Sequence, residues 1–182
     1  MRLGRARDTE HRLVAWNAIL AGTFYKAVIV QDIKRAIDLL RALPPVNPER
    51  VGITGTSYGG ELAVTYAALD ERIKAASFHS YGGSLGRASG IIGTKKAQPH
   101  YDHVIPGSST FLHKEDMIWL VAPRALQGVR GDRDDFADPN FTSAVRQGWR
   151  VFDTERQLEL LTVPGGHEYF IDPAVRFFRS RL

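Results

Sequence analysis

The sequence predicts an α/β protein whose mainly parallel sheet is flanked by helices. Three observations lead to this prediction. Strand-like and helix-like runs alternate four times along the chain, a glycine-rich turn joins one strand directly to a helix, and 182 residues are enough for one domain but not for two. The 43% hydrophobic and 24% charged residues are typical of a globular protein. We therefore expect residues 1–182 to form a single domain.

The first predicted elements lie on either side of the glycine-rich turn. Isoleucine, leucine and alanine recur at spacings of three and four over Tyr25–Leu43, which is typical of an amphipathic helix, and Pro44–Pro45 ends it. The apolar run Arg50–Thr54 predicts a short strand. After the turn, Leu62–Leu69 has a helical composition and Ile73–Phe78 predicts a second strand.

The pattern then becomes irregular over residues 80–118. This stretch is rich in glycine, serine and histidine, and it predicts an excursion of loops and short helices that forms a lid over the site. Regular elements return in the last third of the chain. We expect a strand at Ala125–Val129, a helix at Phe141–Phe152, a strand at Leu158–Val163 and a closing helix at Pro173–Leu182.

Composition and charge exclude several classes of function. The net charge of +4 is spread along the chain, and its densest basic patch, Met1–Arg7, is short and has no aromatic residues, so we expect no nucleic-acid partner. No apolar stretch approaches the roughly 18 residues of a membrane span, and Leu13–Leu20 has no signal cleavage site. We expect no membrane partner and, by default, a cytoplasmic location. The lack of cysteine excludes disulfides and a cysteine nucleophile.

The main chemical motif is the run Gly55–Gly59, which reads Gly-Thr-Ser-Tyr-Gly between a predicted strand and a predicted helix. This is the context of a G-x-S-x-G nucleophile elbow, a tight turn that lifts the serine hydroxyl above the sheet. Side chains two residues before and after the serine would collide with neighbouring backbone, so both positions favour glycine. Ser57 is the predicted nucleophile, and the Tyr58 N–H is the predicted donor to an oxyanion. The alternative is a plain glycine-rich turn.

A serine nucleophile needs a histidine base and an acid that orients it. His167 lies in a glycine-rich loop between the last predicted strand and helix, where ligands meet an open α/β sheet. The turn Arg130–Asp135 follows the third predicted strand and contains three aspartates. Asp134 is the first choice for the acid, Asp132 the second and Asp135 the third. The order serine, aspartate, histidine along the chain is the one expected for such a site.

The pocket wall and the cofactors are less constrained by the sequence. We expect Phe78, His79, Tyr81 and Trp119 to line the pocket, with ordinary core or loop packing as the alternative for each. No metal and no other cofactor is expected. The segment 100–103 contains two histidines and one carboxylate in an irregular stretch, which is a poor ligand set for a metal ion.

Together these motifs resemble the C-terminal part of an α/β-hydrolase, and most closely the acetyl xylan esterase and dienelactone-hydrolase-like serine esterases. The resemblance covers about Tyr25–Leu182. Its matching phrases are Val46–Val51, Gly55–Gly60, Ala67–Ala75, Ala122–Arg124, Gly131–Asp134 and Gly166–Glu168. The resemblance implies an α/β-hydrolase fold in which Ser57, Asp134 and His167 form a catalytic triad.

The resemblance also implies that this sheet is reduced. Members of the family have more strands before the elbow than this chain provides, so we expect a truncated or minimal hydrolase. The early loop that supplies the second oxyanion donor in the family has no counterpart. The strand at Val51–Thr54 would then be an open edge, which favours pairing with another segment. We expect Leu13–Val30 or a second copy of the chain to cover it, the latter giving a homo-oligomer.

The predicted activity is hydrolysis of a small-molecule carboxylic ester through an acyl-enzyme. A short acyl group is the default, because the sequence contains no long apolar lid helix suited to lipids. Two alternatives stay open. The elbow also resembles that of prolyl-oligopeptidase-like serine peptidases, although these carry an added domain that restricts access. The other alternative is a non-catalytic hydrolase fragment.

Overall fold

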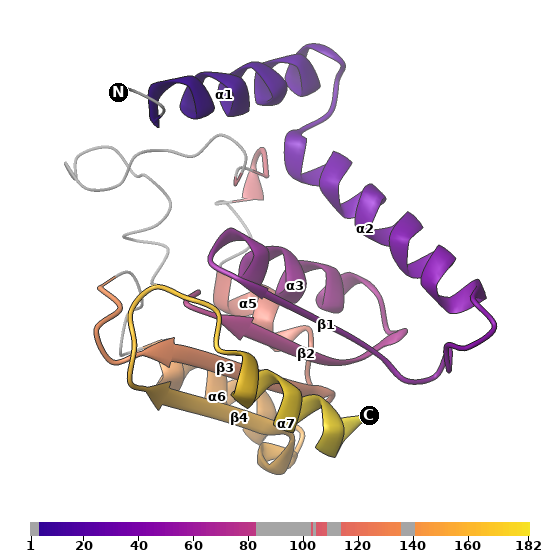
Figure 1. Ribbon diagram of the computed structural model, residues 1–182, viewed down its shortest axis with the longest axis vertical. Coiled ribbons are helices and arrows are strands. Elements are labelled where there is room, and N and C mark those ends of the chain that lie inside the picture. The colour runs from indigo at the N-terminus through magenta and orange to yellow at the C-terminus, as the bar shows by residue number, and fades with distance from the viewer. Residues whose placement is uncertain (1–3, 83–102, 104, 109–113, 136–140) are drawn as a thin grey trace.

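The protein is described by a computed structural model that covers residues 4–82, 103, 105–108, 114–135 and 141–182 (Figure 1). Neighbouring strands pair in parallel in a four-stranded sheet of order β1-β2-β3-β4. These strands are Val51–Thr56, Ile73–His79, Ala125–Gly131 and Leu158–Val163. All four coincide with predicted strands, and the predicted α/β class with a parallel sheet is confirmed.

Helices connect and flank the strands. Four of them coincide with predicted helices: α2 (Tyr25–Ala42), α3 (Tyr58–Leu69), α6 (Phe141–Val151) and α7 (Ile171–Arg181). The sequence did not predict α1 or the short helix η3, and it foresaw only unspecified short helices where α5 lies. These elements are α1 (Gly4–Leu20), α5 (Lys114–Trp119) and η3 (Glu155–Gln157). The predicted excursion 80–118 lies mostly outside the described residues.

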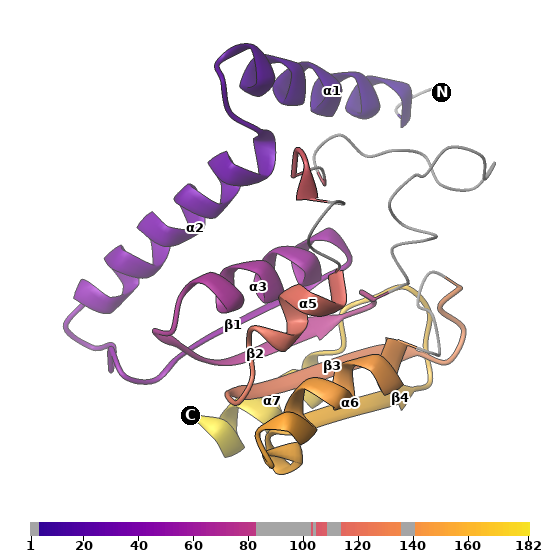
Figure 2. The same ribbon diagram turned by 180° about the vertical axis from the view of Figure 1, so that it is seen from behind.

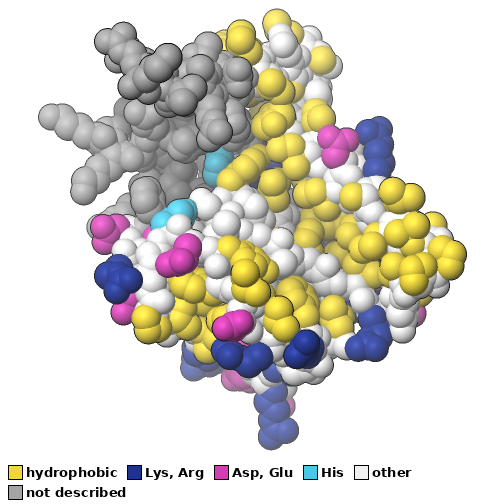
Figure 3. Space-filling model, viewed as in Figure 1, with side chains coloured by type: hydrophobic (Ala, Val, Ile, Leu, Met, Phe, Trp, Pro, Cys, Tyr) yellow, Lys and Arg dark blue, Asp and Glu magenta, His cyan; other side chains and the backbone are white. Residues whose placement is uncertain are grey.

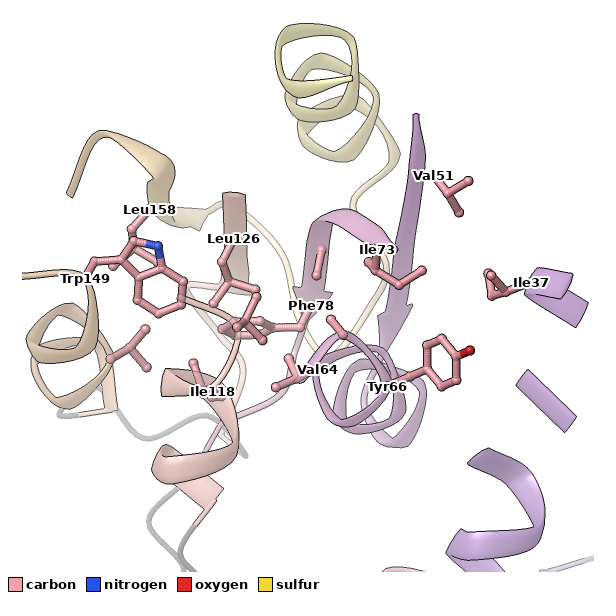
Figure 4. Close-up of a cluster of buried hydrophobic side chains, with 14 residues drawn as sticks. Ile37, Val51, Val64, Tyr66, Ile73, Phe78, Ile118, Leu126, Trp149 and Leu158 are labelled. Atoms are coloured by element: carbon pink, nitrogen blue, oxygen red, sulfur yellow. The ribbon is translucent and has the colours of Figure 1, made fainter. Parts of the chain in front are cut away.

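The sheet is sandwiched between two helical layers (Figures 1 and 2). On one face, side chains of α3, α5 and α6 pack against the strands, and the main core cluster includes Val64, Ile118 and Trp149 (Figure 4). On the other face, α7 is the packed helix among the described residues, with Phe177 against Ala75 and Ala125. The carboxyl ends of all four strands therefore meet at one edge of a three-layer sandwich, where ligands of such folds bind.

The strand β1 is an edge of the sheet, and among the described residues β2 is its hydrogen-bonded neighbour. The expectation that Leu13–Val30 would cover this edge is wrong. That segment forms the end of α1 and the start of α2, and neither helix pairs with β1. Instead, Ile37 of α2 joins the core cluster beside Val51 (Figure 4). Pairing with a second copy stays a prediction.

Large apolar side chains are exposed on α1 and α2 (Figure 3). On α1 they include Leu13, Trp16 and Leu20, the last of which is 80% exposed. No single helix in the described part of the chain is both long and apolar enough to cross a membrane. The helical residues of α1 and α2 pass that test of length and composition only as a pair, with a bend of 92° between them.

Candidate active site

The turn between β1 and α3 has the geometry of a nucleophile elbow. Ser57 adopts φ 54° and ψ −122°, a conformation that is sparsely populated by residues other than glycine. Its N–H donates to the His79 carbonyl oxygen at 2.9 Å, which ties the turn to the end of β2. A Cβ at Gly55 would lie 2.2 Å from the Gly59 carbonyl oxygen, so only glycine fits there. Gly59 itself has open space around it, and the steric requirement therefore applies to Gly55 alone.

The structure brings Asp134 and His167 together. The Nδ1 atom of His167 lies 3.1 Å from Oδ1 of Asp134 and 3.3 Å from its Oδ2. The Asp134 side chain is 0% exposed, whereas that of His167 is 34% exposed. A buried carboxylate of this kind accepts a hydrogen bond from Nδ1–H, and the other ring nitrogen is then the unprotonated acceptor. This is the orienting arrangement that a general base requires.

A glycine at the end of β3 allows the loop that carries Asp134 to lie close to the loop that carries His167. A Cβ at Gly131 would lie 2.4 Å from the carbonyl oxygens of Gly165 and Gly166, so the loops after β3 and β4 touch through their backbones. Asp132, the second candidate acid, accepts the Gly165 N–H at 3.0 Å and thereby holds the histidine loop. Asp135, the third candidate, is exposed. The three aspartates of one turn thus have three different environments.

Glu168, which follows His167, is hydrogen-bonded to Thr56, which precedes Ser57. The Glu168 carbonyl oxygen accepts the Thr56 hydroxyl at 3.2 Å and the Ser80 hydroxyl at 3.1 Å. The Glu168 N–H donates back to the Ser80 oxygen at 3.2 Å. The loop that carries the predicted base is therefore fixed against the carboxyl ends of both β1 and β2, beside the elbow.

The structure corrects the expected pocket wall. Phe78 is buried in the core, where its ring lies against Gly128 and makes an edge contact with Tyr81 at 5.9 Å. His79 is fully buried and hydrogen-bonded within the fold, so it too belongs to the interior. Tyr81 is half-buried and lies against Gly60, next to the elbow, and its role as wall stays a prediction.

Trp119 lies elsewhere. Its ring packs against Gly148 of α6, and it lines a cavity of about 420 Å³ together with residues of that helix and the turn after it. These further residues are Gln147, Val151 and Phe152. Neither Ser57 nor His167 contributes to this cavity. The structure therefore gives Trp119 no place in the pocket we expected.

A buried ionic cluster beside the elbow was not predicted from the sequence. Glu61, in the first turn of α3, forms an ion pair with Lys26 of α2, and the two side chains are 4% and 5% exposed. Its other oxygen lies 2.9 Å from Nδ1 of His103. The His103 ring in turn lies 4.1 Å from the ring of Tyr58. A lysine on the apolar side of an otherwise amphipathic helix was the one signal of this cluster in the sequence.

No group of histidine, aspartate and glutamate side chains within the described ranges is placed to hold a metal ion. The segment 100–102, which supplied part of the weak metal motif, lies outside those ranges. His103 is described, and it contacts Glu61 as part of the ionic cluster.

Comparison with known proteins relates part of the chain to an esterase family. Residues 18–104, a little under half of the chain, match the family model described as acetyl xylan esterase (AXE1). The matched residues include Ser57, whereas Asp134 and His167 lie beyond them. A putative hydrolase, YtaP, from Bacillus subtilis (strain 168) is 27% identical over 117 residues, which are 64% of this chain and 38% of that protein.

Solved structures show the fold of this chain. A glucuronoyl esterase from Solibacter usitatus superposes with a TM-score of 0.66 and 18% identity over 84% of this chain and 47% of that one. A putative acetyl xylan esterase from Bacteroides fragilis NCTC 9343 gives a TM-score of 0.68 at 16% identity over 84% and 40%. The chain thus has an α/β-hydrolase fold and spans about half the length of these relatives or less.

Proposed function

We propose that this chain is the triad-bearing part of a serine esterase that hydrolyses short-chain carboxylic esters. The observation that carries the proposal is the contact of 3.1 Å between His167 Nδ1 and the buried Asp134 carboxylate. Its place at the carboxyl ends of the strands, beside a strained serine turn, supports the same activity. The match of residues 18–104 to an esterase family model agrees with it.

The proposed reaction has two halves. The Ser57 oxygen attacks the ester carbonyl while His167 takes the hydroxyl proton at Nε2, and Asp134 stabilises the imidazolium through Nδ1–H. The tetrahedral intermediate collapses to an acyl-enzyme as His167 gives that proton to the departing alcohol. Water then attacks the acyl-enzyme, again with His167 as base, and the carboxylic acid leaves as the Ser57 hydroxyl is restored.

Stabilisation of the oxyanion is assigned to the start of α3. Tyr58 is the first residue of that helix, and the backbone N–H groups at a helix N-terminus favour a negative charge nearby. An oxyanion that forms above Ser57 therefore lies next to a suitable donor. Removal of one of two oxyanion donors typically lowers kcat by about 10²–10³-fold. A site with a single donor and an intact triad would therefore still accelerate the reaction over its uncatalysed rate.

Hydrolysis of p-nitrophenyl acetate tests the proposal. We expect the wild-type chain to release p-nitrophenol, and Ser57→Ala to lower kcat by about 10³-fold or more. Ser180→Ala, which removes the hydroxyl of an exposed residue on α7, serves as the matched control and should keep wild-type activity. Equal rates for wild type and Ser57→Ala would show that the chain has no serine esterase activity. Faster cleavage of an aminoacyl anilide would instead indicate a peptidase.

A further inference from the structure

A chain of buried polar side chains runs beneath α7, on the sheet face opposite the main core. It begins at His79, the last residue of β2, whose side chain is fully buried. Nδ1 of this ring lies 3.2 Å from the backbone nitrogen of Phe170, and Nε2 lies 2.9 Å from the Ser77 hydroxyl. Phe170 follows His167 by three residues, so the chain begins at the loop of the predicted base.

The hydrogen bonds fix the proton on this histidine. A backbone N–H can only donate, so Nδ1 of His79 must be the unprotonated acceptor for Phe170. The proton of the neutral ring therefore sits on Nε2 and is donated to Ser77. The Ser77 hydroxyl in turn donates a hydrogen bond to the Gln127 amide oxygen at 2.7 Å. Every donor up to this point has one acceptor, and the direction of the chain is unambiguous.

The far end of the chain is anchored in β4 and α7. The Gln127 amide nitrogen donates to Glu159 at 2.6 Å and to the Pro173 carbonyl oxygen at 3.2 Å. Gln127 and Ser77 are both 0% exposed. A protonated His79 would leave two donors facing each other at Phe170, and burial lowers the pKa of this ring to about 4. The neutral form that the network needs is thus the form the site favours.

We propose that His79 is a positioning residue of the esterase site: its unprotonated Nδ1 holds the Phe170 backbone and thereby keeps His167 against Asp134. The inference rests on the proposed function of His167. It assigns His79 a role quite different from the pocket wall expected from the sequence. The histidine loop is held by Asp132 at its beginning, by Ser80 in the middle and by His79 at its end.

Two variants separate the positioning role from simple packing. In His79→Asn the amide group stands near the position of Nδ1 and can still accept from Phe170. In His79→Gln the amide group reaches toward Ser77, and the Phe170 N–H loses its acceptor. Both variants remove the ring that packs at 4.3 Å from Tyr169, so the loss of packing is matched.

We expect His79→Gln to lower kcat for p-nitrophenyl acetate by about 10–100-fold with KM nearly unchanged, because His167 is displaced without loss of the acyl pocket. His79→Asn should keep kcat within about threefold of wild type. Equal losses of kcat in the two variants, following their losses in Tm, would overturn the proposal and leave His79 a structural residue only.

Nitrogen-15 NMR of the ring nitrogens makes the test independent of activity. In wild type, His79 should be the Nε2–H tautomer and the Phe170 amide should exchange slowly; an Nδ1–H tautomer would overturn the proposal even if neither variant folds. The His167 ring signals should shift in His79→Gln and stay near wild type in His79→Asn. With such shifts and no esterase activity in wild type, only the proposed function fails. With activity and no shifts, only the positioning role fails.

Discussion

At the scale of single residues, burial separates side chains that the sequence presents as equivalent. One turn contains Asp132, Asp134 and Asp135, and their positions along the chain do not show which of them is the acid. In the structure Asp134 is buried behind His167, while Asp132 accepts a backbone N–H from the histidine loop. A carboxylate that is fully buried needs a partner such as this imidazole, which makes Asp134 the strongest candidate.

The three aspartates therefore give a graded prediction. Asp134→Asn should lower kcat by up to about 10⁴-fold, because an amide at this position favours the wrong tautomer of His167. Asp135→Asn is the matched control and should have wild-type activity. Asp132→Ala, which removes the acceptor of the Gly165 N–H, should fall between them through a looser loop. Steady-state hydrolysis of p-nitrophenyl acetate measures all three. Near-normal activity of Asp134→Asn would move the acid to one of its neighbours.

Sequence analysis proposes site residues where a local motif defines them. Ser57 is a candidate because it lies in a Gly-x-Ser-x-Gly turn, and His167 because it lies in a glycine-rich loop after a strand. His79 and Glu61 were missed because their roles depend on burial by distant elements. The partner of His79 is 91 residues away in sequence, and that of Glu61 is 35 residues away. No spacing rule within one segment could reveal such pairs.

At the scale of elements, the ionic cluster ties α2 to α3 directly beneath the elbow. The Lys26–Glu61 pair is almost fully buried, whereas the Lys34–Asp38 pair on the same helix is about half exposed. Buried pairs are costly to break, because the remaining charge has no solvent. Exposed pairs within one helix contribute little. The junction of these two helices therefore depends on complete pairing of its charges.

A double-mutant cycle tests this difference between the buried and the exposed ion pair. Lys26→Met should lower the free energy of unfolding by about 3 kcal/mol, because Glu61 keeps a buried charge without its lysine. Adding Glu61→Gln should restore most of that loss, since the glutamine still offers an acceptor to His103. Lys34→Met is the control and should cost less than about 1 kcal/mol. Urea denaturation measures each value; strictly additive losses in the double variant would mean that the two buried charges are not coupled.

At the scale of the whole molecule, the sheet was more predictable than what surrounds it. Each strand is an apolar run bounded by turn residues, and the observed β4 has the same bounds as predicted. The helix α1 was missed because several of its large apolar side chains are exposed: Leu13, Trp16 and Ile19 are all more than 45% exposed. Periodicity reveals a helix by the apolar face that it turns to the core, and among the described residues the main contacts of this helix are with α2.

The polar network beneath α7 couples local protonation to the stability of the whole fold. In the unfolded chain His79 takes up a proton near its usual pKa of 6.5, whereas in the folded chain burial lowers that pKa to about 4. Between these values the unfolded state binds more protons than the folded state. The free energy of unfolding therefore decreases as the pH falls from about 6.5 toward 4, and this contribution is fully present only above that window.

A comparison with His79→Asn isolates this contribution, because asparagine does not titrate and the other histidines are unchanged. Between about pH 7 and pH 5 the wild-type chain should lose about 2 kcal/mol more of its free energy of unfolding than the variant loses. Urea denaturation at the two pH values gives both differences. If wild type and His79→Asn lose equal amounts of their free energy of unfolding, His79 titrates alike in the folded and unfolded chains. The acceptor role of its Nδ1 would then be lost at mildly acidic pH, and the histidine loop would have to be held by Asp132 and Ser80 alone.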